Sequence, residues 1–132
     1  MRRQPARVDL ALLLLRVILA AVFAANGYLK WTGAMERIAG LFMSVHIPFP
    51  DVTVRLVATL EVGGAALLLA GVWTRLVGVW FVIEMAVAIV KVVWPQGFIG
   101  GYEFELTVLT VALALALAGG GAYSLGRDRF SQ

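Results

Sequence analysis

The hydrophobic residues of the chain gather into four long stretches, which shorter polar segments separate. The stretches cover residues 10–28, 54–73, 76–94 and 102–118. Each is long enough, or nearly so, to cross the roughly 30 Å hydrocarbon core of a bilayer, because a helix rises about 1.5 Å per residue. The last stretch is the shortest, and the glycines at 119–121 favour a helix break after it. The pattern predicts four membrane-spanning helices.

The segment between the first two stretches has a helical pattern of its own. Four apolar residues recur there at the spacing of one helical face: Ile38, Leu41, Phe42 and Val45. We therefore predict a short helix that lies in the outer membrane interface and stops before Pro48. An ordered connector between spans is the more common role for such a segment. The alternative role is a lid over whatever the helices enclose.

Composition supports the membrane assignment. The 132 residues are 61% hydrophobic and 14% charged, which leaves too few charged side chains to cover a soluble domain of this size. We predict an all-α integral membrane protein, a four-helix bundle that forms a single domain over residues 1–132. The chain has no cysteine, which excludes disulfides, thiolate metal sites, iron–sulfur clusters and a cysteine nucleophile.

Basic residues indicate the direction of the chain through the membrane. If both termini face the cytoplasm, that side holds six basic residues: Arg2, Arg3, Arg7, Arg75, Arg127 and Arg129. The outer side then holds four: Lys30, Arg37, Arg55 and Lys91. This bias predicts a multi-pass protein of the cell membrane with both termini cytoplasmic. The net charge is only +3, without a basic cluster interleaved with aromatic residues, so we expect no nucleic-acid partner.

Four ionisable residues fall at membrane depth: Arg16, Glu61, Glu84 and Lys91. A charge at the bilayer centre costs about 2.5–3.5 kcal/mol on insertion scales, and it usually faces the protein interior with a partner. Because two of these residues are cations and two are anions, we predict a buried charge network in which the opposite charges neutralise each other. The depth of each residue in the membrane follows from its distance along the helix, at about 1.5 Å per residue. Residues at similar depth are Arg16 and Glu84, and Lys91 and Glu61, so we predict these two pairs. Glu61 is also placed to bridge both cations.

Polar residues continue from this depth toward the outer side. Lys30 lies fourteen residues after Arg16, on the same face of the first span, and Asn26 lies next to Lys30 on that face. We predict an outward-facing polar pocket with these ligand-binding residues: Asn26, Lys30, Glu61, Lys91 and Glu103. Such a pocket would hold a small ligand or pass protons. The alternative is that the charges are buried structural links that fix helix register, and the residues alone favour neither reading.

No established catalytic motif occurs in the chain. His46 is the single histidine and lies just before Ile47 and Pro48, where a solvated loop histidine is expected. One histidine cannot supply bis-histidine haem ligation, and no carboxylate–histidine spacing resembles a metal site. A P-loop, a dinucleotide-binding glycine motif and a Ser–His–Asp set are also missing. No catalytic residue, metal or intrinsic cofactor is predicted, and any redox chemistry would need a diffusing cofactor such as a quinone, or a cofactor of a partner.

Three stretches carry recognisable motifs: LLLLRVILAAVFAANGYLKW, ATLEVGGAALLLAGVWTRL and GFIGGYEFEL. In order and spacing, over about residues 12–117, they resemble the DoxX family of small four-span membrane proteins. The residues that match the motifs of the family are Arg16, Gly27, Lys30, Glu61, Gly64, Thr74, Arg75, Gly101, Tyr102 and Glu103. Asn26 departs from the pattern, because the family often has histidine there. This chain therefore lacks a titratable imidazole at that position.

The resemblance implies a four-helix membrane bundle. It also implies a different partner for Arg16, namely Glu61, because both residues match family motifs. Some relatives are subunits associated with thiosulfate:quinone oxidoreduction, and others are linked to oxidative-stress complexes. Fold and family alone do not assign an activity to this chain.

Two functions remain open at this point. The first is a membrane subunit or accessory protein of a redox system that binds a quinone or a small anion such as a sulfur oxyanion, while a redox partner subunit supplies electrons. The second is a non-catalytic lipid-binding or scaffold protein whose charges only fix the bundle. The sequence has no cysteine, haem ligands or nucleotide motif, and this favours a non-catalytic role for the isolated chain. Membrane lipids are expected partners in either case, and a homo-oligomer is compatible with both.

Overall fold

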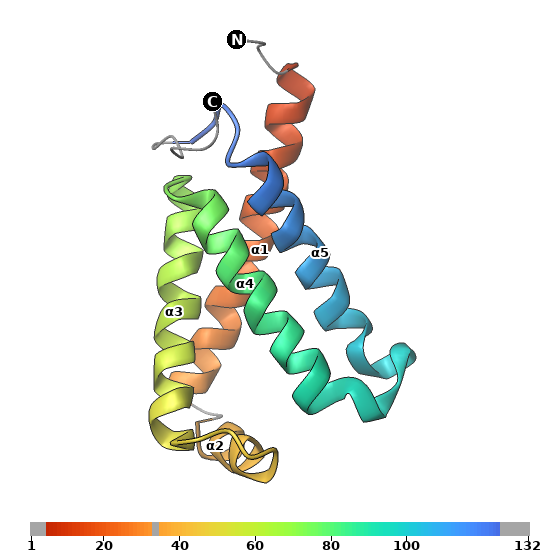
Figure 1. The fold of residues 1–132 in the computed structure, drawn as a ribbon. Helices are drawn as coiled ribbons and strands as arrows, with labels where there is room; N and C mark the ends of the chain where they lie inside the picture. Colours follow the sequence, from red (N-terminus) through yellow and green to blue (C-terminus); the bar gives the residue numbers. More distant parts are fainter. Residues whose placement is uncertain (1–4, 33–34, 125–132) are drawn as a thin grey trace. The chain divides into compact units, whose positions relative to one another are not determined.

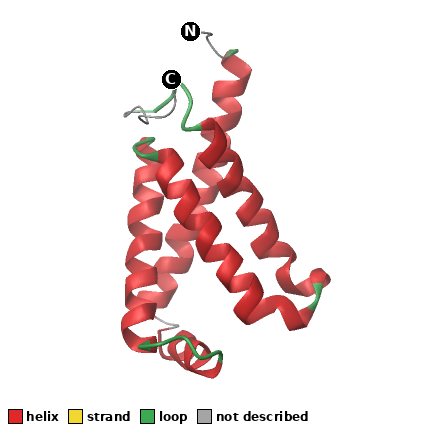
Figure 2. Ribbon diagram, viewed as in Figure 1, coloured by secondary structure: helices red, strands yellow, loops and turns green. Residues whose placement is uncertain are grey.

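The structure, a computed structural model, describes residues 5–32 and 35–124. This part of the chain consists of helices joined by short loops and contains no strand (Figures 1 and 2). The α-helices in chain order are α1 (Ala6–Thr32), α2 (Met35–Ser44), α3 (Pro50–Ala70), α4 (Thr74–Ala88) and α5 (Glu103–Ala118). The predicted all-α class is confirmed.

Four helical stretches are long and apolar enough to cross a membrane: Ala6–Thr32, Pro50–Ala70, Thr74–Gln96 and Phe98–Ala118. They coincide with the four apolar stretches of the sequence, so the four predicted spans are confirmed. The first runs four residues beyond the predicted apolar stretch at each end, because helical geometry continues into polar residues such as Asp9 and Lys30. With 27 residues, α1 is about 40 Å long and exceeds the thickness of the hydrocarbon core.

The third span changes its helical form near its end. After Ala88 the chain widens into a π-helical turn at Ile89–Val93 and then tightens into a 3-10 turn at Trp94–Gln96. Side chains before and after such a change no longer keep the spacing of a regular α-helix. This irregularity affects the direction of Lys91, which lies inside the π-helical turn.

A glycine-containing turn joins the third span to α5. Gly97 and Gly100 have positive φ angles of 79° and 73°, which glycine adopts without steric strain. Ring contacts hold the turn together. Tyr102 stacks on Trp94 with ring centroids 5.1 Å apart, and Phe98 meets Tyr102 edge-on at 5.6 Å. The turn thus fixes α4 and α5 as a helical hairpin.

The short helix predicted between the first two spans is α2. At its end, Ile47 N–H donates to the Phe42 carbonyl at 2.9 Å. His46 N–H donates to the Met43 carbonyl at 3.1 Å, and His46 has a φ of 63°, the left-handed conformation that commonly ends a helix. The single histidine is therefore an exposed turn residue, as predicted. The position of α2 in the membrane interface stays a prediction.

The internal contacts of the chain divide it into two compact units. Unit 1 comprises Met1–Leu19 and Leu67–Gln132, and unit 2 comprises Ala20–Ala66. Unit 1 therefore contains the first half of α1, the end of α3, and the hairpin of α4 and α5. Unit 2 contains the second half of α1, α2 and most of α3. The single domain over residues 1–132 stays a prediction.

Small residues let α4 and α5 pack closely within unit 1. Gly78 of α4 lies against Ala112 and Ala116 of α5, and a Cβ atom added at Gly78 would lie 2.8 Å from the Ala112 carbonyl oxygen. Phe81 and Leu115 are fully buried and extend the core of this unit. Membrane helices commonly approach each other in this way, because packing between them depends on close van der Waals contact.

A similar close approach joins α1 and α3 within unit 2. A Cβ atom added at Gly27 would lie 2.9 Å from the Ala58 carbonyl oxygen and 2.7 Å from the Val62 side chain. Val54 and Ala58, one turn apart on α3, are fully buried. The C-terminal part of α1 is thereby held against the middle of α3.

Candidate functional site

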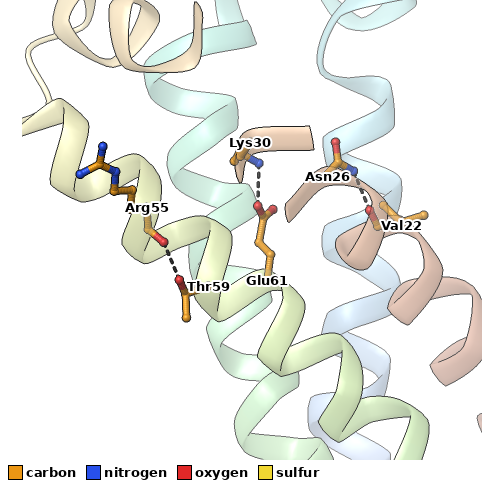
Figure 3. A network of polar contacts seen from close by, with 6 residues as sticks. All are labelled: Val22, Asn26, Lys30, Arg55, Thr59 and Glu61. Carbon is orange, nitrogen blue, oxygen red and sulfur yellow. Dashed lines mark hydrogen bonds and ion pairs between the residues drawn. The ribbon is translucent and has the colours of Figure 1, made fainter. Parts of the chain in front are cut away.

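An ion pair between α1 and α3 is the central polar feature of unit 2 (Figure 3). The Lys30 ammonium nitrogen lies 2.6 Å from Oε1 of Glu61, and the two side chains are 16% and 2% exposed. The predicted membrane depths favoured Lys91 as the partner of Glu61, whereas in the structure the partner of Glu61 is Lys30. A pair buried in membrane-spanning helices is costly to break, since a single charge would remain in apolar surroundings.

The position of Gly27 explains how the two side chains reach each other. Gly27 precedes Lys30 by three residues, so both lie on one face of α1. A Cβ atom at Gly27 would lie only 3.2 Å from Cβ of Glu61. Because glycine has no side chain, α3 comes close enough for a direct hydrogen bond between the ammonium and the carboxylate.

Asn26 is the third polar residue on this part of α1. It precedes Lys30 by four residues, which places it one helical turn earlier on the same face. Its Nδ2 donates to the Val22 carbonyl at 2.7 Å (Figure 3), and this bond uses one of the two N–H donors of the amide. Both Asn26 and Lys30 are half-buried. The helix therefore presents an amide and an ammonium one turn apart.

A second cation of α3 lies outside this cluster. The Arg55 side chain is exposed and points away from Lys30 and Glu61 (Figure 3). The backbone carbonyl of Arg55 accepts a hydrogen bond from Oγ1 of Thr59 at 2.8 Å, and Thr59 is exposed as well. One side of α3 thus carries the buried carboxylate, and another carries exposed polar groups that take no part in the ion pair.

Arg16 belongs to unit 1, and its side chain is fully buried at 0% exposure. Its Nη1 donates to the Leu68 carbonyl at 2.9 Å and to the Leu69 carbonyl at 3.5 Å. Its Nη2 donates to the carbonyl of Tyr123. Within residues 5–32 and 35–124, the hydrogen-bond partners of Arg16 are these backbone carbonyls. The prediction that Arg16 pairs with a glutamate was wrong for this part of the chain.

The geometry of helix ends explains why carbonyl oxygens can receive this cation. Leu68 and Leu69 lie in the last turn of α3, where carbonyl groups have no acceptor role inside the helix. The same end of a helix carries a partial negative charge, which favours a nearby cation. Arg16 therefore ties the first half of α1 to the end of α3 and to the segment that follows α5.

Two further members of the predicted charge network differ in exposure. Glu84 is half-buried, whereas Lys91 is exposed. Glu84 and Lys91 are seven residues apart, which in a regular α-helix would place both on one face, but α4 ends at Ala88 and Lys91 lies in the π-helical turn Ile89–Val93. The wider turn changes the direction of Lys91 from the one that regular spacing assigns. The prediction of a buried Lys91 was therefore wrong.

Glu103 has a structural role in the first turn of α5. Its Oε1 accepts a hydrogen bond from the N–H of Gly100 at 2.8 Å, which closes the turn before the helix. The predicted ligand-binding residues fall into both units, with Asn26, Lys30 and Glu61 in unit 2 and Lys91 and Glu103 in unit 1. Only the three residues of unit 2 therefore form the candidate site, and a shared pocket of all five stays a prediction.

The contacts of the segment after α5 were not predicted from the sequence. The N–H of Ala122 donates at 3.0 Å to Oδ1 of Asp9, in the first turn of α1. A Cβ atom added at Gly121 would lie 3.2 Å from the side chain of Leu12. The segment therefore returns onto α1 within unit 1 (Figure 1). The glycines at 119–121 indicated only a helix break, although small residues also permit such close packing.

Comparison with known proteins identifies the family. The sequence profile of the DoxX family matches residues 11–94, a range that includes Arg16, Lys30 and Glu61. The chain is 34% identical over 111 residues to "Putative oxidoreductase CatD" of Bacillus subtilis (strain 168), which covers 84% of this chain and 81% of that protein. No solved structure matches the chain. With its four apolar helices, the chain is a multi-pass membrane protein and belongs to the DoxX family.

Proposed function

We propose that the chain is a membrane subunit or accessory protein of a redox system, and that it binds a quinone headgroup or a small oxyanion beside Lys30 and Glu61. The observation that carries this proposal is the ion pair itself, with 2.6 Å between an ammonium and a carboxylate that is 2% exposed. Ionisable groups within membrane spans commonly serve binding or proton transfer. The name of the Bacillus relative, an oxidoreductase, supports a redox context.

The polar groups of the site suit both ligand classes. An ammonium has three N–H donors, and Lys30 directs one of them to Glu61, so two remain for a ligand. The second N–H of the Asn26 amide adds a further donor. A quinone carbonyl oxygen accepts hydrogen bonds, and the positive charge of Lys30 favours an oxyanion such as thiosulfate.

In this proposal the ion pair also handles protons. Reduction of a quinone to a quinol consumes two electrons and two protons. The electrons come from the redox centre of a partner protein. The Lys30 ammonium donates a proton to the quinone oxygen, and the Glu61 carboxylate, 2.6 Å from that nitrogen, passes on the protons that replace it.

The competing function is a non-catalytic lipid-binding or scaffold protein. The packing at Gly27 favours it, since a Cβ atom there would lie 2.9 Å from the backbone of α3. Two helices packed this closely need a fixed register, and a buried ion pair supplies one. The two functions therefore differ in whether the pair binds anything besides itself.

Mass spectrometry of the protein purified in native lipid separates the two functions. Under the redox proposal, a quinone co-purifies with the wild-type protein and is lost from Lys30→Met and Glu61→Gln. Arg55→Gln is the matched control, because it removes an exposed cation of α3 that points away from the pair. If the wild-type protein carries only bulk phospholipid, and neither a short-chain benzoquinone nor thiosulfate binds in titrations, the scaffold function is supported.

We further propose that both termini are cytoplasmic, so that the ion pair lies toward the outer side. Lys30 stands in the last turn of α1, and an inward N-terminus places that turn near the outer interface. The chain has no cysteine, so single cysteines report on topology. Ser44 and Ala122 are both exposed. An impermeant maleimide applied to intact cells should label Ser44→Cys and spare Ala122→Cys, and the opposite result reverses the orientation.

A further inference from the structure

One side of the first half of α3 stays exposed in the described part of the chain. Its apolar side chains Val52, Leu56 and Leu60 are 63%, 56% and 37% exposed. Val54 and Ala58, by contrast, are fully buried on the side that packs against α1. This half of α3 therefore has a packed side and an open side, and the open side of a membrane span faces either lipid or another protein.

The open side also carries two charges of opposite sign. Asp51 stands in the first turn of α3, Arg55 follows one turn later, and both are exposed. The Arg55 side chain points away from the Lys30–Glu61 pair (Figure 3). In the described part of the chain, neither Asp51 nor Arg55 takes part in an ion pair. A cation and a carboxylate on the open side of a span are thus left for groups outside the chain.

Thr59 continues the same side of α3 one turn after Arg55. The spacing of four residues puts Asp51, Arg55 and Thr59 in one row along the helix. Thr59 is exposed, and its Oγ1 donates to the Arg55 carbonyl at 2.8 Å, so the hydroxyl needs no further partner. A small side chain of this kind lets a neighbouring membrane helix approach closely.

Two copies of the chain can satisfy this row reciprocally. Copies inserted in the same direction present parallel α3 helices, and a two-fold axis along the membrane normal brings the same side of each helix together. Asp51 and Arg55 are separated by about 6 Å along the helix. A helical side chain leans toward the N-terminus of its helix, so Arg55 extends toward the level of Asp51 on the facing helix. Each guanidinium then meets the carboxylate of the other copy.

The sign and order of the charges favour a second copy over a lipid. An anionic headgroup suits Arg55 but is repelled by Asp51, whereas a second copy supplies both counter-charges at fixed levels. Burial of apolar side chains gives little drive for association inside a bilayer, so close packing and polar contacts determine which helices associate. The reciprocal charges therefore provide the choice of partner and the register, which Val52 and Leu56 alone do not.

We propose that the open side of α3 is the interface of a parallel two-fold homodimer, in which Asp51 of each copy pairs with Arg55 of the other. Thr59 lies at the close approach of the two helices, and Val52 and Leu56 pack beside it. The Lys30–Glu61 pair lies on another side of α3, so the interface does not depend on the redox proposal.

Oxidative crosslinking in native membranes tests this contact. The chain has no cysteine, so Thr59→Cys introduces a single thiol at the close approach. Treatment with copper phenanthroline should give a disulfide-linked dimer. Thr110→Cys is the matched control and should stay monomeric, because Thr110 is also exposed and its hydroxyl bonds to the Leu106 carbonyl of its own helix. Equal crosslinking of the two variants indicates random collision and overturns the proposal.

Charge reversals in the Thr59→Cys background test the ion pairs. Asp51→Lys brings cations together across the interface, and Arg55→Glu brings carboxylates together. Either variant should weaken dimerisation by roughly 10- to 100-fold, because both reciprocal contacts are lost. Coexpression of the two variants with different tags should restore a mixed dimer, since each contact then joins opposite charges again. This restoration also shows that both variants fold.

Three results contradict the proposal. Crosslinking that is unchanged by both reversals, or a mixed pair that crosslinks no better than the separate variants, excludes the Asp51–Arg55 contact. A monomeric wild-type protein from which native mass spectrometry detects an anionic phospholipid that Arg55→Gln loses assigns the open side to lipid. Lys30→Met combined with Glu61→Gln should crosslink as the wild-type protein does, so failure of the redox proposal is distinguishable from failure of this one.

Discussion

Removal of the Lys30 ammonium should destabilise the protein far more than removal of an exposed cation. In Lys30→Met, the carboxylate of Glu61 stays 2% exposed and loses the ammonium that lies 2.6 Å from it. The loss of one partner of a buried pair costs about 3–5 kcal/mol, because the other charge remains uncompensated. For a chain of this size, about 1 kcal/mol corresponds to roughly 3–6 °C in Tm. We therefore expect Tm to fall by about 10–20 °C.

Replacement of both partners should restore most of the loss. In Lys30→Met combined with Glu61→Gln, no charge remains at the contact, and the two side chains nearly keep their volumes. Buried pairs replaced by neutral side chains are often close to neutral in stability. The double variant should therefore unfold within about 1 kcal/mol of the wild-type protein. A stability deficit in the single variant that disappears in the double variant is the signature of a direct ion pair.

The measurement is thermal unfolding followed by tryptophan fluorescence in detergent. Lys91→Met is the matched control, since it makes the same substitution at an exposed lysine and should change stability by less than about 0.5 kcal/mol. If the double variant is as unstable as Lys30→Met, the two residues do not interact. If Lys91→Met is the more damaging single variant, Lys91 and not Lys30 neutralises Glu61, and the observed pairing is refuted.

Three glycine substitutions give further predictions, each measured as a change in Tm. Gly27→Ala places a Cβ atom 2.9 Å from the Ala58 carbonyl oxygen, so it should destabilise by about 1–3 kcal/mol. Gly63→Ala meets nothing within 4 Å and lies inside α3, so it should stabilise by about 0.5–1 kcal/mol, and a loss would show hidden contacts at this face. Gly71→Ala combines a φ of 75° with a Cβ atom 2.5 Å from Nη1 of Arg16, and a neutral result would contradict the described turn.

The membrane spans could be predicted because their signal is long and simple. About twenty consecutive apolar residues suffice for a span, and each of the four stretches meets or approaches that length. The helix ends were less predictable. α1 begins at Ala6 and continues to Thr32, because backbone hydrogen bonding tolerates polar residues that a hydropathy pattern leaves out. The change of helical form after Ala88 was not predictable either, since no glycine or proline marks it until Pro95.

The residues of the candidate site could be predicted from the sequence, but which of them form an ion pair could not. Lys30, Glu61 and Asn26 were recognisable because ionisable and amide groups are rare within apolar stretches. Depth counting treated each charge as if it stood at its own Cα atom, and it therefore paired Glu61 with Lys91. The contact that forms instead depends on how closely two backbones approach, and this distance is set by a residue without any polar group, Gly27.

Arg16 also shows that the depth of a Cα atom does not reveal the partner of a long side chain. Its Cα atom lies well inside the first span, which suggested a deep charge that needs a carboxylate. The side chain, however, reaches the last turn of α3, where the Leu68 carbonyl lies 2.9 Å from Nη1. A helix end offers several partial negative charges that require no titratable residue, so no acidic position in the sequence could have revealed the partner. The same reach brings Nη2 to the Tyr123 carbonyl, so a single buried cation joins its own helix to two segments that lie 52 and 107 residues away in the sequence. A neutral side chain at Arg16 would remove these links together, which gives this position a structural reason to be a permanent cation.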